Sequence, residues 1–115
     1  MIELSIIDKN SIDGIAYNRD NKALMLLITD HLDWKDEYNH LIMLQEKINN
    51  YIHYCETKQY LNVYNQEKIL MAVIDIHFLV EPSKKAFDFL QEVQNQVGQL
   101  GIKIQCTISG ESDEC

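Results

Sequence analysis

Histidines and acidic side chains gather in one short stretch that begins at Thr29. Imidazole nitrogens and carboxylate oxygens together are ligands for zinc, manganese or iron, and a histidine beside a carboxylate is also a common general base. Glu37 and His40 are three residues apart, so they would share one face of a helix. The candidates for a metal or catalytic site are therefore Asp30, His31, Asp33, Glu37 and His40.

The same acidic residues also have a structural interpretation. They precede an amphipathic run, so Asp30 or Asp33 could cap a helix, and Asp33 with Asp36 approximates a capping box. Asp36 and Glu37 place negative charge in the first helical turn, where the helix dipole favours it. The only tryptophan, Trp34, would close the corner between strand and helix. Because no HExxH motif or other recognised metal geometry is present, the sequence favours the structural role, with no catalytic residue, bound metal or cofactor.

Two polar features remain open. His31 and His40 flank the predicted corner without an evident structural reason. Asp75 and His77 lie two residues apart on one strand face, as a general base and its orienting carboxylate would, but no nucleophile is identifiable. The sequence favours the simpler interpretation that this second pair lies near the solvent-exposed end of the strand.

The apolar periodicity predicts the elements that position these residues, in the order β-β-α-β-α-β. Strands are expected over 11–17, 22–29, 69–80 and 102–108, and helices over about 33–58 and 83–100. Lys47 falls on the predicted solvent face of the first helix. One apolar stripe on each helix predicts an α+β two-layer sandwich, with both helices on one face of a mixed sheet of about four strands. Residues 1–108 would form this single domain, and residues 109–115 a short acidic C-terminal tail.

The second face of this sheet is predicted to be apolar where a two-layer sandwich should be polar. Such an exposed patch is typical of an interface, here a sheet-to-sheet homodimer. Two alternatives are that residues 1–10 fold over the patch, or that the strand faces are assigned one residue out of register. The residues concerned are Met25, Leu27, Ile69, Met71 and Val73.

Composition limits the classes of function. A net charge of −8 over 115 residues argues against nucleic-acid binding, and is compatible with a basic protein partner or with solubility alone. No apolar run is long enough to span a membrane, and the N-terminus does not resemble a signal peptide. Three cysteines without paired spacing indicate free thiols, and hence a reducing cytoplasm.

The sequence DHLDW at 30–34, followed by HLIMLQEKINNY at 40–51, resembles a family of small bacterial proteins of unknown function. The resemblance covers roughly residues 12–108 and implies that the strand-to-helix junction is the hallmark of the family, but it supplies no catalytic residues. The sequence therefore predicts a small, non-catalytic cytoplasmic interaction module, homodimeric or acting as an immunity- or antitoxin-like inhibitor of a basic partner. The alternative is a metal-dependent enzyme or metal-binding protein that uses the Asp30–His40 cluster.

Overall fold

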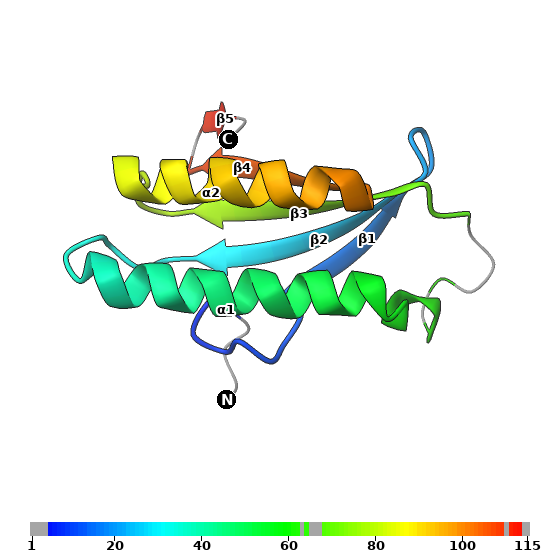
Figure 1. The fold of residues 1–115 in the computed structure, drawn as a ribbon, viewed down its shortest axis with the longest axis horizontal. Helices are drawn as coiled ribbons and strands as arrows, with labels where there is room; N and C mark the ends of the chain where they lie inside the picture. The colour runs from blue at the N-terminus through cyan, green and yellow to red at the C-terminus, as the bar shows by residue number, and fades with distance from the viewer. Residues whose placement is uncertain (1–4, 63, 65–67, 110, 114–115) are drawn as a thin grey trace.

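The computed structural model describes residues 5–62, 64, 68–109 and 111–113, and shows two helices packed on one sheet (Figure 1). Two short 3-10 helices, Gln59–Asn62 and Gly98–Leu100, follow the two α-helices. The main elements in chain order are β1 (Gly14–Asn18), β2 (Ala23–Asp30), α1 (Glu37–Glu56), β3 (Met71–Phe78), α2 (Lys84–Val97), β4 (Ile102–Ile108) and β5 (Glu111–Asp113).

The strands are ordered β1-β2-β3-β4-β5 across the sheet. The outer pairs, β1 with β2 and β4 with β5, are antiparallel, whereas β2, β3 and β4 run parallel. Each parallel pair is connected through a helix, and since such crossovers share one hand, both helices lie on the same face of the sheet (Figure 1). The predicted α+β architecture is confirmed, with β5 added to the sheet by three residues of the acidic tail.

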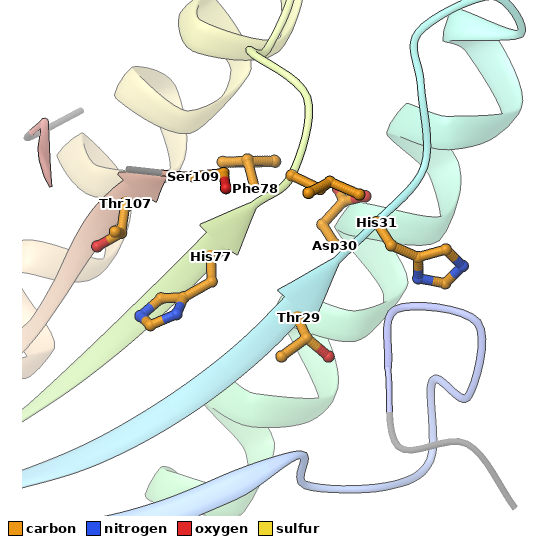
Figure 2. Close-up of a pocket in the computed structure, with 8 residues that line it drawn as sticks. Thr29, Asp30, His31, His77, Phe78, Thr107 and Ser109 are labelled. Carbon is orange, nitrogen blue, oxygen red and sulfur yellow. The ribbon is translucent and has the colours of Figure 1, made fainter. Parts of the chain in front are cut away.

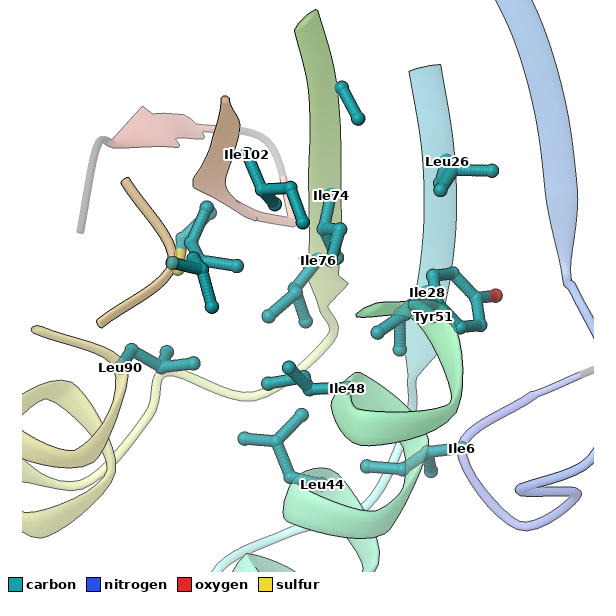
Figure 3. Close-up of a cluster of buried hydrophobic side chains, with 14 of the residues drawn as sticks. Ile6, Leu26, Ile28, Leu44, Ile48, Tyr51, Ile74, Ile76, Leu90 and Ile102 are labelled. Carbon is teal, nitrogen blue, oxygen red and sulfur yellow. The ribbon is translucent and has the colours of Figure 1, made fainter. Parts of the chain in front are cut away.

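The core lies between the helices and one face of the three parallel strands (Figure 3). Alternate residues of β2 point into it, as do alternate residues of β3 and β4, because successive side chains of a strand leave on opposite faces. Burying each large aliphatic side chain contributes roughly 1.5–3 kcal/mol. The central residues are Leu26, Ile28, Leu44, Ile48, Ile74, Ile76, Leu90 and Ile104.

The start and the buried face of α1 differ from the prediction. Asp36 is the N-cap residue but its side chain makes no cap hydrogen bond, so the capping box is wrong. The Asp36 carboxylate instead accepts from the side-chain amide of Asn39 at 2.8 Å. Tyr38, predicted on the apolar stripe, is 74% exposed, whereas Lys47, predicted on the solvent face, is completely buried. Hydrophobic spacing places a lysine outward by default, and only tertiary acceptors can reverse that placement.

Those acceptors come from the N-terminal arm, which we define as residues 5–13. The Lys47 ammonium donates to the Asp13 carboxylate at 2.7 Å, to the Asp8 carbonyl oxygen at 2.6 Å and to the Ser11 carbonyl oxygen at 2.8 Å. The Lys47 and Asp13 side chains are 0% and 1% exposed. Ile6 enters the core on the helix side of the sheet (Figure 3). The described part of residues 1–10 therefore packs beside α1 and not over the second sheet face, and residues 1–4 lie outside the described residues.

The arm also completes the edge of β2 beyond the end of β1. The Asp13 carboxylate accepts from the Thr29 amide at 2.9 Å, and the Ile6 amide donates to the Thr29 carbonyl oxygen at 2.9 Å. The Tyr51 hydroxyl donates to the Leu27 carbonyl oxygen and accepts from the Asp13 amide at 2.8 Å. Burial raises the pKa of Tyr51, so its hydroxyl remains a donor at all physiological pH values.

The prediction that all the cysteines are free thiols holds for Cys55 but not for Cys106. Cys55 is free and half-buried, and burial raises its pKa to about 11, so its thiolate is scarce at neutral pH. Cys106, by contrast, is disulfide-bonded. In the part of the chain that the structure describes, neither α-helix combines the length and apolar character needed to cross a membrane.

We predict that Lys47→Met destabilises the fold by about 3–5 kcal/mol, because it leaves the buried Asp13 carboxylate without its partner. Asn49→Met on the exposed side of the same helix is the matched control and should change stability by less than about 0.5 kcal/mol. Urea denaturation of both variants checks this prediction. Equal effects would show that the buried ion pair does not contribute to stability.

Candidate functional site

The structure divides the predicted Asp30–His40 cluster into one buried pair and three separate residues. Asp30 and His40 are buried at the end of β2 and in the first turn of α1. His31 and Asp33 are exposed in the connecting loop, and Glu37 is half-buried at the start of the helix. Among the described residues, no three His, Cys, Asp or Glu side chains are arranged to hold a metal ion.

The buried pair shares a proton. His40 Nδ1 lies 2.9 Å from the Asp33 carbonyl oxygen, which can only accept, so Nδ1 carries a hydrogen. Nε2 lies 2.6 Å from an Asp30 carboxylate oxygen, and two lone pairs at that distance would repel. One proton therefore lies between Asp30 and His40, and the pair is neutral overall whichever residue holds it.

The surrounding contacts fix this pair in the corner between strand and helix. Trp34 stacks on the His40 ring, with 3.6 Å between centroids and 17° between planes. The Trp34 indole nitrogen donates to the Val80 carbonyl oxygen at 3.4 Å, which ties the loop to the segment that follows β3. The second Asp30 carboxylate oxygen accepts from the Leu32 amide at 3.1 Å. The predicted closing role of Trp34 is confirmed, and His40 is explained as the residue that Trp34 covers.

The second sheet face, which we call the helix-free face, has an apolar part on β2 and β3. Met25, Leu27 and Met71 are half-buried there, and Val73 between them is only 4% exposed. The register places these residues on one face, because Met25 pairs directly with Val73 and paired residues of neighbouring strands point to the same side of the sheet. Ile69, predicted with them, precedes β3 and packs against the core instead, because the strand begins two residues later than expected.

The same face becomes polar toward the carboxyl ends of the parallel strands. Thr29, His77 and Thr107 are register neighbours on β2, β3 and β4, and we call them the polar row. His77 Nε2 lies 2.9 Å from one Asp75 carboxylate oxygen, and the Thr107 hydroxyl donates to the other at 3.2 Å. The sequence placed Asp75 and His77 on one face, but Thr107 could not be found without the register of β3 and β4.

A cavity of about 370 Å³ opens at this end of the sheet (Figure 2). The polar row lines it, together with five neighbouring residues: Asp30, His31, Phe78, Leu79 and Ser109. The volume is sufficient for a small molecule.

We predict that His40→Ala destabilises the fold by about 3–5 kcal/mol, because the buried Asp30 carboxyl then loses its histidine partner and Trp34 loses its stacked ring. His31→Ala removes an exposed histidine from the same loop and should change stability by less than about 0.5 kcal/mol. Thermal and urea denaturation of the two variants measure the difference. Similar losses would mean that the buried pair is not what stabilises this corner.

We further predict a pH-dependent contribution from Asp30. Burial is the largest influence on its carboxyl and raises its pKa from the ordinary 3.8, although the hydrogen bond to His40 opposes the shift. The folded protein therefore holds this proton at pH values where the unfolded chain has released it. The stabilisation is complete below the ordinary pKa and is lost as the pH rises through the raised value.

Asp30→Asn provides the reference, since its amide can donate to His40 Nε2 and its carbonyl oxygen can accept from Leu32, but it does not titrate. The free energy of unfolding of the native protein, minus that of the variant, should decrease as the pH rises above about 4. Urea denaturation across a pH series measures this difference. A difference that is constant or increases with pH would contradict the assignment.

Comparison with known proteins gives a family but no activity. No curated protein and no solved structure matches the chain. A family model matches residues 4–110, which include both helices, β1 to β4, and the whole of the Asp30–His40 corner. The chain therefore belongs to the family of unknown function DUF6572.

Proposed function

We propose that the protein is a small, non-catalytic interaction module that pairs with a second copy of itself through the helix-free face. The observation that carries this proposal is the apolar part of that face, formed by Met25, Leu27, Met71 and Val73. Neither helix covers these residues, because both pack on the opposite side of the sheet (Figure 1). Apolar groups on the open side of a two-layer sandwich gain stability when a second layer covers them.

The distribution of charge favours a second copy as that layer. The whole chain carries a net charge of −8. On β1 to β4, however, the helix-free face has one carboxylate, Asp75, and one ammonium, Lys103, and Asp75 is bonded to His77. Two copies can therefore approach through this face without bringing their negative charge together. Methionines at positions 25 and 71 suit such a contact, since their flexible side chains adapt to the facing surface.

A basic protein is the second candidate partner, as an immunity- or antitoxin-like inhibitor would require. The net charge of −8 favours it by long-range attraction. Such a partner would bind the acidic surfaces outside the helix-free face, so substitutions within the apolar part would leave its affinity unchanged. The same variants therefore discriminate between the two candidates.

Light scattering coupled to gel filtration tests the self-association. We expect the native protein at high micromolar concentration to have twice its chain mass of 13.5 kDa, and Met25→Glu to have the chain mass alone. Gln45→Glu adds the same charge on the exposed side of α1 and should remain dimeric. Circular dichroism melts establish that both variants are folded. A native protein with the mass of one chain, or a Met25→Glu variant that stays dimeric, would refute the proposal.

A further inference from the structure

We propose that the polar row binds the ammonium group of a small alkylamine in the cavity at the carboxyl ends of β2, β3 and β4. The cavity holds about 370 Å³ and has the His77 ring and the Thr107 hydroxyl in its wall (Figure 2). Neither residue takes part in the Asp30–His40 corner, and neither belongs to the apolar part of the helix-free face.

Hydrogen-bond direction determines what this site can accept. The Thr107 hydroxyl has one hydrogen, and it donates that hydrogen to an Asp75 carboxylate oxygen at 3.2 Å. The neighbouring Asp75 oxygen lies 2.9 Å from His77 Nε2, and because a carboxylate only accepts, Nε2 must donate to it. The donors of both residues are thus directed toward one carboxylate on the same face of the sheet.

The groups that His77 and Thr107 do not use in these two hydrogen bonds are acceptors. With its hydrogen on Nε2, a neutral His77 presents the Nδ1 lone pair, and Nδ1 has no hydrogen bond to another described residue. The His77 side chain is 47% exposed, so a ligand can reach it. Thr107 keeps two oxygen lone pairs. A ligand that donates hydrogen bonds complements this arrangement, whereas a ligand that only accepts them would leave each lone pair opposed by another.

Charge and shape narrow the class of donor. The Asp75 carboxylate is hydrogen-bonded to both His77 and Thr107, and the chain as a whole carries a charge of −8, so a cationic donor is favoured over a neutral one. Phe78 and Leu79 also line the cavity, and Leu79 is 60% exposed. They offer an apolar surface to the carbon chain of the ligand. An ammonium group on a short alkyl chain satisfies both requirements.

The test follows the histidine ring signals by nuclear magnetic resonance in a slightly alkaline buffer, where imidazole is ordinarily neutral. Butylamine is the probe, at constant pH and ionic strength, and butan-1-ol and butyrate are its neutral and anionic counterparts. We expect butylamine to shift the His77 signals saturably at millimolar concentrations, with the His53 signals unchanged. Butan-1-ol should bind more weakly, and butyrate should produce no saturable shift.

Thr107→Val keeps the shape of the side chain but removes one acceptor, and should weaken butylamine binding roughly fivefold. Thr57→Val, at the far end of α1, is the matched control and should bind as the native protein does. The proposal is overturned if the His77 signals do not saturate with butylamine, if either counterpart binds as tightly, or if Thr107→Val retains native affinity. The same titration is repeated on Met25→Glu, the variant designed to prevent self-association. Butylamine binding to that variant shows that the amine site does not depend on the dimer.

Discussion

The proton held between Asp30 and His40 is the constraint on which the strand-to-helix corner depends. Asp30 ends β2, His40 lies in the first turn of α1, and the 2.6 Å contact between them fixes where the helix starts and which face it buries. Within segment 30–34, each residue other than His31 either forms this contact or binds one of its two partners. Leu32 donates to the Asp30 carboxylate, Asp33 accepts from His40, and Trp34 covers its ring.

Helix α1 is held at a second point by the same kind of interaction. Lys47 follows His40 by about two helical turns and is bonded to the N-terminal arm, so two buried polar contacts face the same side of one helix. Neither contact is expected to stabilise the fold more than a well-packed apolar pair would, because desolvation offsets much of the attraction. Their effect is geometric, since each polar group has partners at only one helix position and a sliding helix would leave it unsatisfied.

The architecture was predictable from sequence because it depends on local periodicity. Alternation in Ile102–Ile108 and the capping residue Ser83 of α2 each identify an element without any knowledge of its neighbours. The buried charges were not predictable, because hydrophobic spacing assigns Lys47 to solvent and its acceptors at Asp8 and Asp13 lie far away in the chain. Thr107 was missed for the same reason: its contact with Asp75 exists only through the register of two strands.

Polar side chains protect a sheet edge that a longer β1 would otherwise cover. Strand β1 has five residues and β2 has eight, so residues 28–30 of β2 have no strand partner on the β1 side. The Asp13 carboxylate and the Ile6 amide bind the backbone of Thr29 in its place, and the Tyr51 hydroxyl binds the carbonyl oxygen of the adjoining Leu27. An open edge is a template for uncontrolled strand addition and fibril growth. The arm that Lys47 holds therefore protects this edge from intermolecular strand pairing at the positions that β1 is too short to cover.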